Sequence, residues 1–181
     1  MEDKLGTSLP SEVQVQVELI PATPDHRPAL SNLLQLYMHD FGEFVPLELG
    51  PDGRFDYPPV PLYWSDPSRF PLLATVDGQW AGFVFVRQLP HVGSKAHIWD
   101  MAEFFVLRGL RHRRIGTWLA HRAFERFHGL WQVRVVESNS VACRFWRVAI
   151  ESFTPSAEPP ESSQIDGYGW NIFRFESPSA R

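Results

Sequence analysis

The sequence predicts one α/β domain in which helices cover both faces of a mixed β-sheet. The chain has 181 residues, a length that suits a single hydrophobic core. Apolar residues alternate with a period of two in some segments and follow helical spacing in others. Successive strand-like segments lead into a strand–helix–strand unit, whose crossover requires one parallel pair. We expect the domain to span residues 13–176, with flexible ends at 1–12 and 177–181.

The first third of the chain contains one strand, one helix and an irregular segment. Residues 13–20 alternate apolar and polar side chains, as in a strand with one buried face. Thr23 and Pro24 give a helix N-cap followed by proline at the first helical position. The apolar positions of that helix are Leu30, Leu33, Leu34, Tyr37 and Met38. Seven prolines among aromatic residues indicate an ordered but irregular or short-helix segment over 40–71.

The remaining elements start with a β-hairpin. Residues 72–76 and 79–87 are β-rich, and Asp77-Gly78 between them favours a tight turn with positive φ. Residues 98–107 predict a third, largely buried strand. An amphipathic helix follows, with an apolar side formed by Ile115, Trp118, Leu119, Ala123, Phe124 and Phe127. We then expect a strand over 131–136, a short helix over 140–148 and, after the polar stretch 156–167, a last strand over 168–175.

Composition excludes several classes of protein. A single cysteine, Cys143, cannot form an internal disulfide or a cysteine-based zinc cluster, and we expect a buried, unreactive thiol. No apolar run reaches the roughly 20 residues of a spanning helix, and the first residues lack the order of a secretory signal. We therefore expect a soluble, cytoplasmic protein. His121, Glu125 and His128 share a helix face, but that face is polar, so we expect a solvated surface and no metal.

Positive charge gathers between the third strand and the following helix. The net charge is −4, yet residues 108–126 contain six arginines and one acidic residue. Such a stretch favours a compact anion over nucleic acid, which needs a wide basic face; the alternative is a solvated helix face after an arginine-rich turn. A helix start presents unpaired backbone N–H groups, and Arg111, Arg113, Arg114 and Gly116 beside it predict a pyrophosphate cradle. Neither a Walker A loop nor a G-x-G-x-x-G motif is present.

Two motifs resemble those of the GNAT N-acetyltransferases. The segment 111–116 (RHRRIG) resembles their Q/R-x-x-G-x-G/A loop, and 139–146 (NSVACRFW) resembles their N-x-x-A-x-x-F-Y segment. The longer pattern, including 36–44 and 57–64, resembles a subgroup of predicted acetyltransferases. The resemblance implies a twisted, mostly antiparallel sheet of about six or seven strands with helices on both faces. It also implies transfer of an acetyl group from acetyl-CoA directly to the amine of a small molecule or peptide.

The resemblance further implies a set of residues that bind acetyl-CoA. Main-chain N–H groups would hold the pyrophosphate, with the backbone of Val106 and the side chain of Asn139 on the pantetheine arm. The full set is Val106, Arg111, His112, Arg113, Arg114, Ile115, Gly116, Thr117, Asn139 and Ala142.

The chain departs from the family motifs at two positions. Arg114 replaces the middle glycine, so it either adopts a strained conformation costing about 1 kcal/mol or adds a phosphate contact. Trp146 stands where many members have a tyrosine that protonates the leaving thiolate, and an indole has no proton to give near neutral pH.

Two carboxylates on the third strand are candidates for the catalytic base. Asp100 and Glu103 are three positions apart, so we expect them on opposite faces of the sheet. We favour Glu103, because Phe104 and Phe105 beside it would raise its pKa by desolvation; the alternative for either carboxylate is pairing with an arginine.

Acceptor contacts are expected from four residues before the hairpin: His39, Tyr57, Tyr63 and Trp64. The alternatives are a histidine that interacts with helix-end carbonyls and aromatic side chains that pack in the core. Two other functions stay open: a non-catalytic protein that binds and senses acyl-CoA, and an arginine-rich module that binds RNA or another polyanion. We expect no membrane partner and no nucleic acid, and a homo-oligomer stays open.

Overall fold

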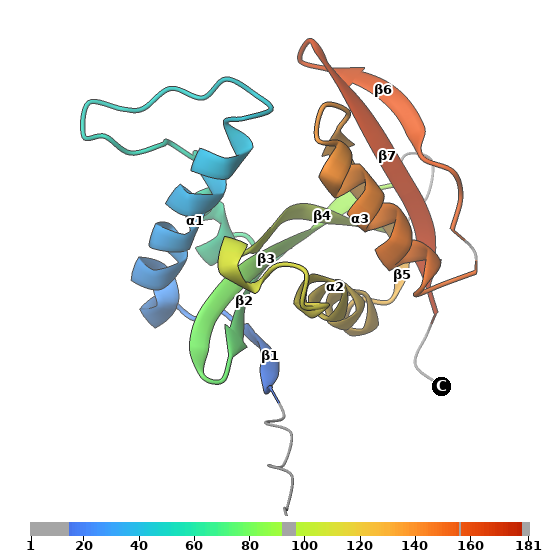
Figure 1. The fold of residues 1–181 in the computed structure, drawn as a ribbon, viewed down its shortest axis with the longest axis horizontal. Helices are drawn as coiled ribbons and strands as arrows, with labels where there is room; N and C mark the ends of the chain where they lie inside the picture. The colour runs from blue at the N-terminus through green and yellow to red at the C-terminus, as the bar shows by residue number, and fades with distance from the viewer. Residues whose placement is uncertain (1–14, 92–96, 156, 179–181) are drawn as a thin grey trace, which may run out of the picture.

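The computed structural model describes residues 15–91, 97–155 and 157–178, and the expected flexible N-terminus 1–12 lies outside them. Seven strands form one sheet in the order β1-β2-β3-β4-β5-β7-β6 (Figure 1). The strands are β1 (Val17–Pro21), β2 (Arg69–Val76), β3 (Gln79–Pro90), β4 (His97–Val106), β5 (Gly129–Val136), β6 (Glu161–Ile165) and β7 (Tyr168–Ser177). The α-helices are α1 (Arg27–Phe41), α2 (Ile115–Arg126) and α3 (Ser140–Glu151). Short 3₁₀ helices are η1 (Pro24–His26), η2 (Val60–Trp64) and η3 (Arg108–Leu110).

The sheet is antiparallel except between β4 and β5, which confirms the mixed sheet expected from the strand–helix–strand unit. The parallel pairing covers three residue pairs and ends at Met101 and Val133. Beyond these residues β4 continues along β3 to Val106, whereas β5 continues along β7 to Val136. The two central strands therefore part after Met101, and their backbones open a gap in the middle of the sheet.

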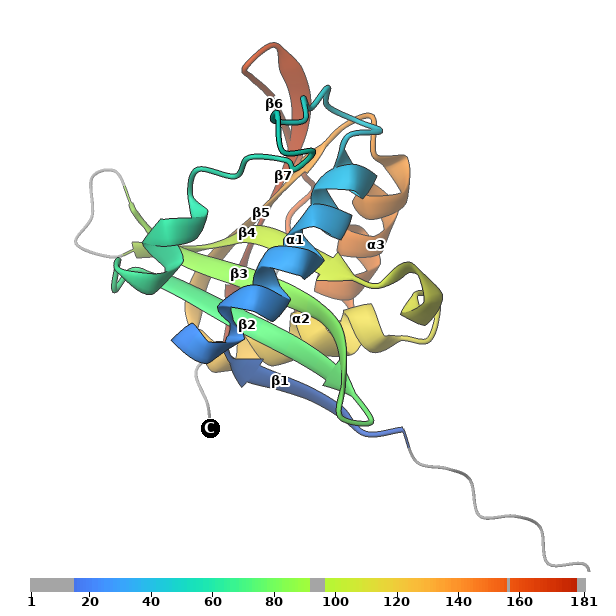
Figure 2. The same cartoon turned by 90° about the vertical axis from the view of Figure 1, so that its left-hand side faces the viewer.

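Helices cover both faces of the sheet, as expected. Figure 1 shows α1 on one side and α2 and α3 on the other, and in Figure 2 α1 crosses in front of β2, β3 and β4. The core on the α1 side contains buried leucines of α1 with aromatic residues of β3 and β4, including Phe83, Phe85 and Phe105. On the other side, Phe124 of α2 and Trp146 of α3 pack with Trp131 of β5.

Strands β6 and β7 form a hairpin that was not expected from the sequence. Residues 161–165 lie in the polar stretch 156–167, for which no strand or helix was predicted. Asp166 and Gly167 form its turn with φ of 52° and 81°, close to the values of 49° and 75° at Asp77 and Gly78 in the expected hairpin. The same Asp-Gly signal therefore marks both hairpins. β6 is an edge strand with exposed polar side chains, which explains why it lacks an apolar pattern.

Other boundaries differ by a few residues. Ser177, which we assigned to the flexible C-terminal tail, is the buried last residue of β7, and its hydroxyl donates to the Phe124 carbonyl at 2.7 Å. The first strand begins at Val17, and residues 13 and 14 lie outside the described part of the chain. None of the helices in the described ranges is long and apolar enough to cross a membrane.

Candidate active site

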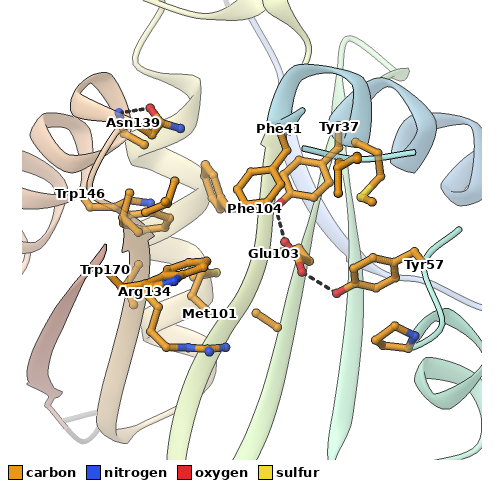
Figure 3. Close-up of a pocket in the computed structure, with 18 of the residues that line it drawn as sticks. Tyr37, Phe41, Tyr57, Met101, Glu103, Phe104, Arg134, Asn139, Trp146 and Trp170 are labelled. Atoms are coloured by element: carbon orange, nitrogen blue, oxygen red, sulfur yellow. Dashed lines mark hydrogen bonds between the residues drawn. The ribbon is translucent and has the colours of Figure 1, made fainter. Parts of the chain in front are cut away.

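A cleft of about 460 Å³ lies where β4 and β5 part (Figure 3). One wall comes from α1 and the segment 47–59, and the other from β5, α3 and Trp170 of β7. The cleft therefore joins the α1 side of the sheet to the start of α3. Its lining includes Tyr37, Phe41, Tyr57, Glu103, Arg134, Asn139, Ala142, Trp146 and Trp170.

A β-bulge in β4 decides which side chains face this cleft. Phe85 of β3 pairs with Glu103, but the next residue, Val86, pairs with Met101, so β4 contains one extra residue at Ala102. Phe85 belongs to the core on the α1 side, and Glu103 opposite it faces the same way. The expectation that Asp100 and Glu103 point to opposite faces is therefore wrong. The extra residue of the bulge places both carboxylates on the α1 side of the sheet.

Glu103 is held by two tyrosines from different segments. The hydroxyl of Tyr37 on α1 donates to Oε2, and the hydroxyl of Tyr57 donates to Oε1 at 2.5 Å (Figure 3). Burial raises the pKa of Glu103 above its ordinary value, although the two hydrogen bonds act in the opposite direction. The result is a carboxyl group with a raised pKa on the cleft wall, which suits a group that must take up a proton.

The two tyrosines remain protonated donors. Burial raises the pKa of Tyr37 and of Tyr57 far above the ordinary value, and the negative charge of Glu103 adds to this effect. Tyr37 is further fixed by its ring, which packs edge-on against Phe83 and Phe105. Glu103 therefore keeps a defined orientation toward the cleft.

Asp100 has a different environment. It is fully buried and does not line the cleft. Its carboxylate accepts hydrogen bonds from Arg87 at 2.7 Å, from Arg134 at 3.1 and 3.2 Å, and from Gln132 at 2.9 Å. With its oxygens occupied in this way, Asp100 is an anchor for two arginines, and Glu103 is the remaining candidate for the base.

The turn before α2 adopts a conformation that is rare for residues with side chains. His112 and Arg114 have φ of 64° and 61°, in the left-handed region. Arg114 stands at the position of the middle glycine of the motif and has the positive φ that is strained for a residue with a side chain, as considered from the sequence. As at any helix start, the first N–H groups of α2 have no acceptor within the helix, so residues 112–117 present backbone donors.

Gly116 allows the start of α2 to approach α3. A Cβ atom at this position would lie 3.2 Å from the Phe145 ring, closer than a normal contact. The two family-like segments thus touch each other through Gly116 and Phe145. In the second segment, Asn139 caps α3 by accepting a hydrogen bond from the Ala142 N–H at 2.9 Å, and both residues line the cleft.

Arg111 is tied to the end of α1. Its Nε donates to the Val106 carbonyl at 2.9 Å, and its terminal nitrogen donates to Asp40 at 2.6 Å; Arg108 also donates to Asp40, at 2.7 Å. Burial would raise the pKa of Asp40, but the hydrogen bonds from Arg111 and Arg108 outweigh it and hold that pKa below its ordinary value. This ion-pair cluster connects the C-terminal end of α1, where Phe41 lines the cleft, to the turn before α2.

The candidate acceptor residues do not gather as a group. Tyr57 lines the cleft, whereas Tyr63 is buried and stacks on Phe85 with ring centroids 4.0 Å apart. Trp64 lies under the guanidinium of Arg27, and the side chain of His39 is exposed beside Asp40. The cleft residues that the sequence did not predict include Tyr37, Phe41, Arg134 and Trp170. The helical pattern gave Tyr37 a core position, and no local signal pointed to Arg134.

Comparison with protein families decides the identity of this fold. The sequence model of the Acetyltransferase (GNAT) family matches residues 30–149, which include most of α1, the parting strands, the turn and most of α3. The chain belongs to the GNAT family. Comparison with curated proteins finds no match for this chain.

Solved structures of GNAT proteins share the fold at low sequence identity. Arabidopsis thaliana NAA60 in complex with a bisubstrate analogue is 14% identical, with a TM-score of 0.63 over 89% of this chain and 98% of that chain. Ribosomal-protein-alanine N-acetyltransferase from Brucella melitensis is 16% identical, with a TM-score of 0.60 over 88% and 99%. A spermidine N-acetyltransferase chimera that includes the Vibrio cholerae enzyme is 11% identical, with a TM-score of 0.59 over 90% and 96%. The acceptors in these names differ, so the shared fold does not specify an acceptor.

Proposed function

We propose that this GNAT protein is an N-acetyltransferase that transfers the acetyl group of acetyl-CoA directly to an acceptor amine, with Glu103 as the base. The observation that carries the proposal is the position of Glu103, a buried carboxyl with a raised pKa, on the wall of the cleft between β4 and β5. A direct transfer needs the amine and the thioester in one cleft, and the cleft reaches from α1 to α3.

Acetyl-CoA would bind through the turn before α2 and the start of α3. The left-handed residues His112 and Arg114 orient the turn, and the N–H groups of residues 112–117 would hold the pyrophosphate. The pantetheine arm would then enter the gap where β4 leaves β5, past Asn139 and Ala142. One of the solved structures with the same fold, Arabidopsis thaliana NAA60, is a complex with acetyl-CoA, which supports this assignment.

The reaction requires two proton movements. Glu103 takes a proton from the acceptor ammonium, and the free amine attacks the thioester carbonyl to form the C–N bond. The tetrahedral intermediate then breaks its C–S bond and releases the CoA thiolate, while the nitrogen loses its second proton to water as the amide forms. Trp146 lines the cleft and packs edge-on against Phe104, but its indole cannot protonate the thiolate. A thiolate with a pKa of about 8.5 leaves without assistance from an acid.

A turnover assay tests the proposal. The purified protein is incubated with acetyl-CoA and a panel of primary amines, thiol release is followed, and calorimetry measures the binding of acetyl-CoA and of CoA. We expect both nucleotides to bind and thiol release to depend on an amine, with one acetyl group added to the product. No binding of acetyl-CoA at millimolar concentration would refute the proposal.

A second candidate function is a protein that binds acyl-CoA without turning it over. The observation that favours it is Trp146, which is buried where many GNAT members have a tyrosine. This alternative predicts calorimetric binding of acetyl-CoA without thiol release for any amine. For the polyanion-binding alternative we find no such observation, because Asp40 already engages Arg108 and Arg111 of the basic stretch.

A further inference from the structure

Two charged side chains, Glu103 and Arg134, line the cleft in the described part of the chain. Glu103 lies on β4 toward α1, and Arg134 extends from β5 into the space between the parting strands (Figure 3). The positive charge of Arg134 acts on Glu103, since it is one of the influences that lower the pKa of that carboxyl. An acceptor in the cleft therefore meets one negative and one positive group.

Arg134 belongs to a hydrogen-bonded cluster of two guanidinium groups and one carboxylate, and Glu103 is a second carboxylate near it. Arg87 and Arg134 share the carboxylate of Asp100, which is fully buried, while the third partner of this carboxylate, Gln132, is neutral. Two guanidinium groups thus face one carboxylate. Once Glu103 has taken up the proton of the acceptor ammonium, these groups have one positive charge in excess, which a ligand carboxylate at Arg134 would balance and a second positive group would increase.

Asp100 also leaves Arg134 able to bind a ligand. The hydrogen bonds to Asp100 use Nε and one terminal nitrogen of the guanidinium, Nη2. The other terminal nitrogen, Nη1, has no hydrogen-bond partner in residues 15–91, 97–155 and 157–178, and the side chain is 27% exposed. A guanidinium that is oriented by one carboxylate and open on its other side is suited to bind a second carboxylate.

The rest of the acceptor side of the cleft is apolar. Phe41 and Leu47 contribute from α1 and the segment that follows it, Pro58 and Pro59 lie next to Tyr57, and Trp170 lies on the side of β7. These groups favour a hydrocarbon or aromatic substituent over a long polar chain.

We infer that the acceptor is an amino acid with a free carboxylate and an apolar side chain, whose amine faces Glu103 and whose carboxylate binds Arg134. The inference rests on the proposed function and names the acceptor class of the same site. It makes Arg134 the residue that determines acceptor specificity, with Asp100 as the positioning residue that orients it.

Matched acceptors test the inference in the unaltered protein. Phenylalanine and leucine are compared with phenethylamine and 3-methylbutylamine, which lack only the carboxylate, and with the corresponding amino-acid amides. We expect kcat/KM to be about tenfold to a hundredfold higher for the amino acids, as for a hydrogen bond between charged groups. Equal or higher kcat/KM for the amines, the amides, a polyamine or a peptide would overturn the inference.

Variants then assign the preference to Arg134. In Arg134→Gln, kcat/KM for phenylalanine should fall toward that of phenethylamine, mostly through KM, while Arg134→Lys should retain part of the preference. The ratio between the two acceptors is the readout, because loss of folded protein lowers both rates equally. Arg122→Gln is the control, since Arg122 lies exposed on α2 beside Glu125 and outside the cleft. An unchanged ratio in Arg134→Gln would overturn the inference.

Calorimetry with acetyl-CoA distinguishes a wrong acceptor class from a wrong proposed function. If acetyl-CoA binds and amines without a carboxylate are the better acceptors, the acceptor class is wrong and the N-acetyltransferase stands. If acetyl-CoA does not bind, both the proposed function and the inference are wrong.

Discussion

The hydroxyl of Tyr37 on α1 donates a hydrogen bond to Glu103 on β4, although the two residues lie 66 positions apart in the sequence. Tyr57, from the segment before η2, donates to the other oxygen of the same carboxylate. The bulge at Ala102 turns Glu103 toward both hydroxyls. Three separate segments of the chain thus position one carboxyl group, and that group is the proposed base.

Replacing Glu103 with glutamine should abolish most of the activity and leave the fold intact. Glutamine cannot accept a proton from the ammonium, so we expect kcat to fall by about 100- to 10,000-fold. It can still accept a hydrogen bond from one tyrosine, and calorimetry should show unchanged binding of acetyl-CoA. Glu125→Gln on the exposed face of α2 is the control. A Glu103→Gln enzyme with normal kcat would exclude Glu103 as the base.

Replacing Tyr57 with phenylalanine should shift the pH dependence of the reaction. The hydroxyl of Tyr57 stabilises the Glu103 carboxylate and lowers its pKa, so removal of this hydroxyl should raise the pKa further. The base is active when ionised, so kcat/KM increases with pH through this pKa, and the acidic limb of the profile should move to higher pH.

Tyr63→Phe is the matched control for this experiment. The Tyr63 hydroxyl is buried and has no hydrogen-bond partner among the described residues, whereas Tyr57 donates directly to Glu103. Its removal should leave the acidic limb in place. A shift to lower pH in Tyr57→Phe, or equal shifts in the two variants, would show that the hydrogen bond does not tune Glu103.

The elements that could be predicted from sequence are those with local signals. The Asp77-Gly78 turn, the periodic helices and the arginine-rich turn before α2 each lie within about 20 consecutive residues, where spacing alone predicts the structure. The positive φ at Arg114 could be anticipated because the motif has glycine at that position. The Asp-Gly turn before β7 carried the same local signal, although the polar edge strand concealed it.

The chemistry of the cleft could not be predicted in the same way, because it depends on register between distant segments. One extra residue at Ala102 reverses the predicted orientation of Glu103 relative to Asp100. Similarly, Arg134 enters the cleft and Asp100 becomes an anchor only because β5 lies parallel to β4 over three residue pairs. No spacing in the sequence contains this information.

Replacing Asp40 with asparagine should destabilise the protein in a pH-dependent way. The pKa of Asp40 is lower in the folded protein than in the unfolded chain, so its stabilisation is present above the unfolded-state pKa and is lost as pH falls through the folded-state pKa. Arg108 is largely exposed, so we expect a loss of about 1 kcal/mol at neutral pH.

Urea unfolding of the unaltered protein and of Asp40→Asn over a pH series measures this effect. The difference in unfolding free energy should be largest near neutral pH and should shrink as the medium becomes acidic. Asp56→Asn is the control, because Asp56 is exposed and forms no ion pair within the described ranges. A difference that grows toward acidic pH would contradict the assigned ion pairs.

Replacing Arg114 with glycine should stabilise the protein and weaken acetyl-CoA binding. Arg114 has φ of 61°, and glycine adopts this conformation without a clash between Cβ and the backbone, so we expect a gain of about 1 kcal/mol in unfolding free energy. The exposed guanidinium lies beside the backbone donors proposed for the pyrophosphate, so its removal should raise the KM for acetyl-CoA.

Arg113→Gly separates these two effects. Arg113 is equally exposed but lies outside the set of residues with positive φ, so glycine there relieves no strain and should lower stability through the entropy of the unfolded chain. Thermal unfolding of both variants, together with their KM for acetyl-CoA, gives two independent readouts. Stabilisation in Arg114→Gly alone would show that the backbone strain lies at the glycine position of the motif. Destabilisation of both variants would show that the backbone at Arg114 is not strained.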